Sequence, residues 1–280
     1  MRWQGRRGSR NIVDRRRVSG RAAGGIGGVG LVAVVLIGWF FGVDLTPLLQ
    51  GQGGFQSAPG EITEADERAA EFVSVTLADT EEVWARVFDE QVGAAYEPVA
   101  LVLFSGATQS ACGGATAATG PFYCPADEMA YLDTDFFATM AQQLGAEGDF
   151  AAAYVVAHEV AHHVQDELGI LAEANAIRQR VSEEESNAIS VRIELQADCY
   201  SGIWARSAAE QFGSIEPGDI DEAMNAAARI GDDALQRRSG QAVQPESFTH
   251  GTSEQRQTWF YRGYETGELA ACDTFGADAL

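Results

Sequence analysis

The spacing of apolar residues predicts helices over most of the chain. Apolar positions three and four apart mark two amphipathic segments separated near Asp79 and Thr80; their apolar residues are Phe72, Val73, Val75, Leu77, Val83, Trp84, Val87 and Phe88. Further helices are predicted at residues 136–144 and 150–168, from the capping box Ser182-Glu183-Glu184-Glu185 to about Gln211, after the cap Asp219, and at residues 253–264.

Two short runs have the composition of strands. Residues 99–104 are Val-Ala-Leu-Val-Leu-Phe, and residues 129–133, beyond a glycine-rich loop, are Met-Ala-Tyr-Leu-Asp. Short apolar runs bounded by turn residues are typical of buried strands. The expected fold class is therefore α+β, mainly α, with one small β-sheet.

One segment is apolar enough to cross a membrane. Residues 22–43 carry no charge, and a stretch of this length spans a hydrocarbon layer of about 30 Å. Arginines lie only on its N-terminal side, which places that side in the cytoplasm. A cleaved signal peptide is the alternative, but the apolar part is long and no Ala-x-Ala site follows it. We expect an uncleaved transmembrane helix.

The chain is expected to have four parts. Residues 1–21 form a basic cytoplasmic head, residues 22–43 the transmembrane helix, residues 44–60 a flexible linker rich in Gly and Gln, and residues 61–280 one domain. This arrangement makes the chain a single-pass membrane protein whose large domain lies outside the cytoplasm.

Charge divides the chain into a basic head and an acidic body. The formal net charge is −22, although eight arginines lie in the first twenty-one residues. An acidic body repels nucleic-acid phosphates, so we exclude nucleic-acid binding. The hydrophobic content of 46% is normal for a domain that buries a core.

The four cysteines belong to a domain assigned to an oxidising compartment, where disulfides form. Cys112 and Cys124 flank a glycine-rich loop, which favours a bond between them. Cys199 would then tie a central helix to Cys272 near the C-terminus. Three pairings are open to four cysteines, and a four-cysteine zinc site is disfavoured because the Cys-x-x-Cys spacing is absent.

The strongest chemical signal is the segment His158-Glu159-Val160-Ala161-His162, which ends an apolar run without helix breakers. Residues four apart project from one face of a helix, so both imidazoles can bind one Zn²⁺. Glu159 lies beside them, where it can take a proton from a metal-bound water. Two buried histidines without a metal are the alternative, which the helical context disfavours.

A catalytic zinc site needs a third protein ligand and an open fourth position. Glu194 is the best candidate, because it lies in the middle of a predicted helix between apolar and small residues. Asp198 lies one turn later on the same face, where it can accept a hydrogen bond from a ligand imidazole. A solvated acidic face is the alternative.

The sequence resembles the bacterial neutral zinc metallopeptidases, small proteins with an N-terminal membrane segment. The resemblance spans nearly the whole chain and is carried by Cys112-Gly113, Gly120-Pro121-Phe122-Tyr123-Cys124-Pro125, Tyr131-Leu132-Asp133, the segment from Ala157 to Gln165, Glu194-Leu195-Gln196-Ala197-Asp198-Cys199 and the segment from His250 to Arg256. Ala161 stands where the family more often has Gly. The resemblance implies a zincin-like domain of the Glu-zincin type, with His158, His162 and Glu194 on zinc and Glu159 as the base.

His250 and Arg256 also look like a pattern found in the prenyl-protease-type membrane zinc peptidases. There the two residues face the substrate carbonyl, so the likeness implies that His250 or Arg256 stabilises the oxyanion. A helix-capping histidine and a surface arginine form an equal alternative. His163 is interpreted as structural, because it points about 100° away from His162 around the helix.

The predicted function is that of a membrane-anchored zinc metallopeptidase, an endopeptidase that uses a zinc-activated water with Glu159 as general base. An extended peptide substrate is expected to pair with the strand at residues 129–133. Two alternatives stay open: a zinc-containing binding or scaffold protein without turnover, and a hydrolase of non-peptide amides such as those of the cell wall.

Overall fold

The computed structural model describes residues 1–17, 62–116, 119–140, 148–277 and 280. The predicted transmembrane helix at residues 22–43 and the linker at residues 44–60 lie outside this set. In the part of the chain that the structure describes, no helix combines the length and apolar character needed to cross a membrane. The described part is α+β and mainly α, as expected.

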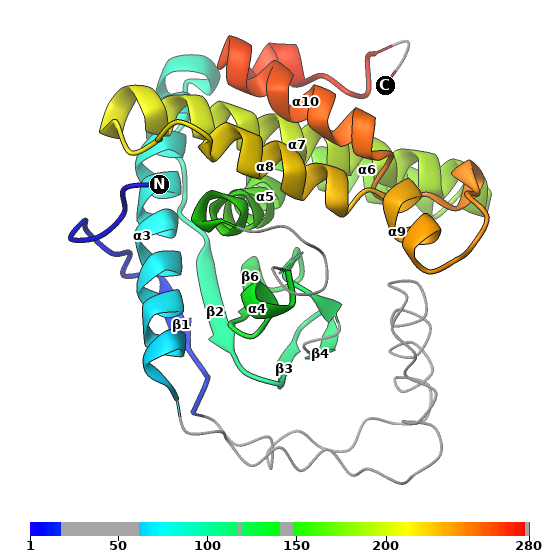
Figure 1. Ribbon diagram of the computed structural model, residues 1–280. Helices are drawn as coiled ribbons and strands as arrows, with labels where there is room; N and C mark the ends of the chain where they lie inside the picture. Colours follow the sequence, from blue (N-terminus) through cyan, green and yellow to red (C-terminus); the bar gives the residue numbers. More distant parts are fainter. Residues whose placement is uncertain (18–61, 117–118, 141–147, 278–279) are drawn as a thin grey trace, which may run out of the picture.

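Helix α5 (Asp149–Glu167) lies at the centre of the fold. It is buried on nearly every side, because its own residues before the histidines are apolar or small on every face of the helix. Helices α7 (Glu183–Phe212), α8 (Asp219–Arg229) and α10 (Ser253–Thr266) form a layer on one side of α5, and the sheet lies on the other (Figure 1). Helix α3 (Glu64–Val87) flanks both layers.

Short helices connect these elements. They are the π-helical turn Phe88–Val92, α4 (Phe136–Thr139), α6 (Ile170–Arg178), α9 (Asp232–Arg238) and the 3-10 turns Pro245–Ser247 and Leu269–Cys272. The capping box predicted at Ser182 is confirmed, since the Ser182 hydroxyl accepts from the N–H of Glu185 and the Glu185 carboxylate accepts from the N–H of Ser182.

The described strands form one four-stranded sheet and one separate hairpin. The sheet has the order β1 (Ile12–Asp14), β2 (Ala100–Phe104), β6 (Met129–Asp133), β5 (Phe122–Cys124), and the hairpin joins β3 (Ala107–Ser110) to β4 (Gly113–Thr116). Strands β1, β2 and β6 run parallel, and β5 is antiparallel to β6. Both strands predicted from the sequence are confirmed as β2 and β6.

Strand β6 has a neighbour on each side. Ala130 pairs with Leu101 of β2 and with Tyr123 of β5. The expectation that a peptide substrate pairs with residues 129–133 is therefore wrong, because the backbone groups of Met129–Tyr131 already bond to strands on both sides.

Two expectations about helices are also wrong. The break predicted near Asp79 and Thr80 does not exist, because Thr80 donates its hydroxyl to the carbonyl of Leu77 and Asp79 pairs with Arg6, so both polar residues fit inside one continuous α3. Asp219, predicted as a cap, is the first residue of α8 and follows Gly218, which is the N-cap residue.

The helix predicted at residues 136–144 is described only as α4, since residues 141–147 lie outside the described set.

Residues 1–17, expected to form a separate basic head, belong to the folded domain. They supply β1, and Trp3 packs edge-on against Phe72 of α3 with ring centroids 5.4 Å apart.

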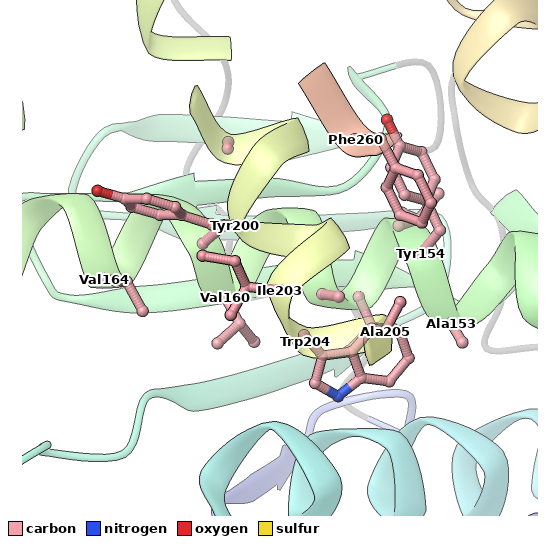
Figure 2. Close-up of a cluster of buried hydrophobic side chains, with 14 of the residues drawn as sticks. Ala153, Tyr154, Val160, Val164, Tyr200, Ile203, Trp204, Ala205 and Phe260 are labelled. Carbon is pink, nitrogen blue, oxygen red and sulfur yellow. The ribbon is translucent and has the colours of Figure 1, made fainter. Parts of the chain in front are cut away.

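Large side chains from three helices form the core around α5 (Figure 2). Phe150 of α5 stacks on Trp204 of α7 with ring centroids 5.6 Å apart, and Tyr154 of α5 meets Phe260 of α10 edge-on at the same separation. This packing fixes α7 and α10 against the helix that carries both predicted histidine ligands.

The two favoured disulfides are confirmed. Cys112 bonds to Cys124 across twelve residues, and Cys199 of α7 bonds to Cys272 across 73 residues. The second bond holds the C-terminal segment against the helix that carries Glu194.

Helices α7 and α10 touch backbone to backbone through two glycines. A Cβ atom placed on Gly202 would lie 2.0 Å from the Phe260 carbonyl oxygen, and one on Gly263 would lie 1.8 Å from the Cys199 carbonyl oxygen. Only glycine permits this approach.

We expect Gly263→Ala to lower the free energy of unfolding by about 3 kcal/mol, because the methyl group pushes two helix backbones apart. Helix propensity alone predicts a gain of about 1 kcal/mol, so the sign of the change separates the two effects. Urea unfolding measures it, with Tyr261→Ala, an exposed change on the same helix, as the control. A stabilised Gly263→Ala variant would contradict the close contact.

Candidate metal centre

Three predicted ligands converge at the C-terminal half of α5. His158 and His162 lie one turn apart on α5, and Glu194 reaches them from α7. The ligand atoms of the three side chains all lie within 4.8 Å of one another. Glu194 Oε2 is 3.0 Å from His158 Nε2, and Glu194 Oε1 is 3.5 Å from His162 Nε2. The arrangement brings together the two histidines and the carboxylate predicted from the sequence.

This donor set fits zinc. Two imidazoles and one carboxylate are a known ligand set of catalytic zinc sites, in which the fourth position stays open. The three side chains are 9–19% exposed, so the site is mostly desolvated but still reachable. In the absence of a metal, the carboxylate and the imidazoles can pair only if an imidazole carries a proton. A divalent cation bound between them would satisfy all three side chains together.

The charge state of Glu194 agrees with a ligand role. Burial by itself would raise the pKa of this carboxyl group, but the nearby imidazoles of His162, His250 and His158 hold it well below its usual range. Glu194 is therefore an anion at neutral pH, which is the form that binds a metal.

His158 lies between two carboxylates. Its Nε2 faces Glu194, and its Nδ1 lies 3.0 Å from Asp198 Oδ1. Burial works against the charged imidazole, but the two carboxylates outweigh it and raise the pKa of His158 to about 10. In the metal-free protein a proton thus neutralises this pocket, and a metal ion takes its place when it binds.

Asp198 is the predicted support of His158, and it is fully buried. Arg256 of α10 donates from Nε to Asp198 Oδ2 at 2.8 Å and from Nη2 to Asp198 Oδ1 at 3.0 Å. Tyr154, one turn before His158 on α5, also donates its hydroxyl to Asp198. Burial opposes ionisation of Asp198, but Arg256 keeps its pKa below the usual range.

Arg256 therefore has a different position from the one predicted. Its side chain is only 3% exposed, and its Nε and Nη2 both donate to Asp198. The guanidinium therefore supports Asp198 and is not presented at the surface of the site. The surface-arginine alternative is equally wrong, because Arg256 is buried.

Gln165, which the sequence analysis missed, orients the second histidine. Its Oε1 lies 2.9 Å from His162 Nδ1, and its Nε2 donates to the Ile193 carbonyl at 2.8 Å. With Nδ1 of His162 hydrogen-bonded to Gln165 and Nδ1 of His158 facing Asp198 at 3.0 Å, both rings turn Nε2 toward Glu194. Gln165 stands three residues after His162, a helical spacing that was available as a signal.

Glu159 is buried beside the ligands, with 8% of its surface exposed. Burial raises the pKa of this carboxyl group, and the neighbouring His162 and His158 partly oppose the rise. A general base that later acts as an acid must be able to exist in both its charged and its protonated form near neutral pH. A raised pKa brings the Glu159 carboxyl group closer to that condition.

His250 lies at the rim of the site on the loop before α10. Gly251, with φ +90°, packs over Val191 and Leu195, the α7 residues that flank Glu194. The His250 side chain is 30% exposed. Burial lowers the pKa of this imidazole, but the charges of Glu194 and Asp232 outweigh burial and raise it.

Asp232 holds this loop in place and was not found from the sequence. Its Oδ2 accepts from the backbone N–H groups of Thr249, His250 and Gly251 at 2.7–3.0 Å. Its Oδ1 lies 3.3 Å from His250 Nδ1. One carboxylate with 1% exposure thus fixes both the backbone and the ring of His250.

His163 points away from the centre, as predicted. Its Nδ1 lies 3.1 Å from the Tyr123 hydroxyl of β5, and its Nε2 donates to the Glu97 carbonyl at 2.8 Å. His163 therefore ties α5 to the sheet and is not a ligand.

Comparison with known proteins identifies the family of the chain. A family model described as "Putative neutral zinc metallopeptidase" matches residues 1–275. The "Uncharacterized protein YpfJ" of Escherichia coli K12 is 48% identical over 99% of both chains. An uncharacterized protein of Mycobacterium tuberculosis H37Rv is 47% identical over 64% of this chain and 62% of its own length. No solved structure matches the chain.

We expect Asp198→Asn to weaken zinc binding about 10- to 100-fold, because the amide cannot hold His158 as the carboxylate does. Titration of the purified protein with zinc against a competing chelator measures the change. Asp221→Asn, an exposed residue of α8, is the control. Equal zinc affinity of Asp198→Asn and the parent would show that Asp198 does not support the site.

Proposed function

The chain belongs to the neutral zinc metallopeptidase family, and from this premise we propose that it is a zinc-dependent peptidase acting through the centre of His158, His162, Glu194 and Glu159. One observation carries the proposal: a buried carboxylate, Glu159, lies on the same helical turn as two histidines that share a third ligand. A zinc site of purely structural role gains nothing from a base at this position, which argues against a scaffold protein without turnover.

The residues divide the chemistry among them. Zinc, when bound, polarises a carbonyl group and lowers the pKa of a water molecule. Glu159 accepts the proton of the attacking water on a carboxylate oxygen and then gives it to the departing amine nitrogen, so no covalent intermediate with the protein is needed. Burial of Glu159 keeps its pKa high enough for the second transfer.

His250 is the candidate for stabilising the carbonyl oxygen as it gains charge. Its side chain is 30% exposed and lies close enough to Glu194 to feel its charge, and its Nδ1 faces Asp232. A donor aimed at the developing oxyanion lowers the barrier more than it strengthens substrate binding. Arg256 acts indirectly, by keeping Asp198 charged and in position.

An extended peptide is the substrate form that suits this site. Strand β5 is an edge strand of the described sheet and contacts α5. Its outer edge, opposite β6, can bond to a peptide backbone. The acidic body of the protein favours neutral or basic peptides.

We expect Glu159→Gln to lower peptide cleavage about 100- to 10,000-fold while the protein still binds one zinc, because only proton transfer is lost. The test uses the purified zinc-loaded protein and a mixed peptide library, analysed by mass spectrometry. Removal of zinc with a chelator should abolish cleavage by the parent, and added zinc should restore it.

The same assay distinguishes the alternatives. Equal cleavage by the parent and by Glu159→Gln would show that Glu159 is not the base. Zinc-loaded proteins that cut no peptide would favour the scaffold and the non-peptide amidase, which cell-wall fragments as substrates would then separate.

We expect Asp232→Asn to lower kcat about 10- to 100-fold with little change in zinc affinity, because the loop that presents His250 loosens. Asp232→Asn combined with His250→Ala should be no worse than His250→Ala alone, since both changes remove one function. Additive losses in the double variant would show that Asp232 acts apart from His250.

A further inference from the structure

The N-terminal segment, residues 1–17, is built into the sheet. Strand β1 pairs in parallel with β2, and Val13 lies opposite Val102. The pairing continues at both ends, because the N–H of Leu101 donates to the Asn11 carbonyl at 2.8 Å and the N–H of Arg15 donates to the Leu103 carbonyl at 2.7 Å. The segment thus covers the edge of β2 that would otherwise expose its hydrogen-bonding groups.

The arginines of this segment have acidic partners in the domain. Arg6 pairs with the buried Asp79 of α3 and lies 4.4 Å above the ring of Phe212. Arg16 is itself buried and donates from Nη1 to the Asp66 carbonyl at 2.9 Å and from Nη2 to Glu67 at 3.2 Å. Removing the partner of a buried charge is strongly destabilising, so these pairs hold the segment against the domain.

The first residue adds a further contact. The α-amino group of Met1 lies 2.9 Å from Asp149 and 3.0 Å from Asp219, at the starts of α5 and α8. The basic segment and the acidic domain therefore match in charge from Met1 to Arg16.

From these contacts we infer that residues 1–17 and residues 62–280 lie on the same side of the membrane. A chain that leaves the folded domain at residue 17 and re-enters it at residue 62 returns to the side of the membrane from which it left. A single crossing by residues 22–43, with a cytoplasmic head and an external domain, would pull β1 away from β2. The arginines were assigned to the cytoplasm because they lie only on the N-terminal side of residues 22–43. In the folded protein Arg6 pairs with Asp79, and Arg16 pairs with Asp14 and Glu67.

Labelling with a membrane-impermeant maleimide tests the inference on the full chain in bacterial cells. Gln4→Cys and Ile177→Cys place one thiol on the exposed surface of each part. The four native cysteines are paired in disulfides, so they do not react. Disulfides form outside the cytoplasm, and we therefore expect both variants to be labelled in intact cells.

The result is decided by comparing the two positions before and after the cells are permeabilised. The same accessibility at both positions supports the inference. Labelling of Ile177→Cys in intact cells, with Gln4→Cys labelled only after permeabilisation, would overturn it.

A second measurement tests the docking by itself. Arg6→Ala should lower the Tm of the purified full chain by at least about 4 °C, because Asp79 is left buried without its cation. Arg10→Ala, a change at an exposed arginine of the same segment, should leave Tm unchanged. Equal Tm values for the two variants would overturn the docking and the inference with it.

Discussion

The buried pair of Asp198 and Arg256 is the interaction on which the rest of the site depends. Asp198 is fully buried and Arg256 nearly so, and together they connect α7 to α10. The same carboxylate binds the Tyr154 hydroxyl and faces His158, both on α5. A buried cluster of this kind is stable only when every charge has its partner. The position of His158 and the packing of α5, α7 and α10 are therefore fixed together.

The residues that converge at the candidate metal centre could be predicted from the sequence because their spacing is local. His158, Glu159 and His162 lie within two turns of one helix, and Glu194 and Asp198 lie one turn apart on another. The 3.6-residue repeat alone therefore places His158 and His162 on one face of their helix, with Glu159 beside them, and Glu194 and Asp198 on one face of the other. Joining the two groups needed only the packing of α7 on α5, across the 36 residues that separate His158 from Glu194.

The parts that sequence analysis missed depend on distant contacts. Arg256 meets Asp198 across 58 residues, and no local pattern shows whether an arginine in a helix points inward or outward. Asp232 reaches the His250 loop across 18 residues without helical spacing. Strand β1 is short, lies among arginines and is separated from β2 by more than eighty residues, so its apolar pair Ile12 and Val13 gave no signal. The small sheet and the main helices were predicted because periodicity and capping residues are local.

The close backbone contacts at Gly202 and Gly263 limit how α7 and α10 can move against each other. Helices that meet through side chains can adjust by changing rotamers, but at Gly202 and Gly263 the backbones of α7 and α10 approach each other with no side chain that could move. The two helices that carry Asp198 and Arg256 are therefore held closely against each other. In the peptidase proposed above, differently shaped peptides would have to be accommodated by the His250 loop, whose backbone is held by hydrogen bonds to one carboxylate, so the range of substrates would depend on how readily that loop moves.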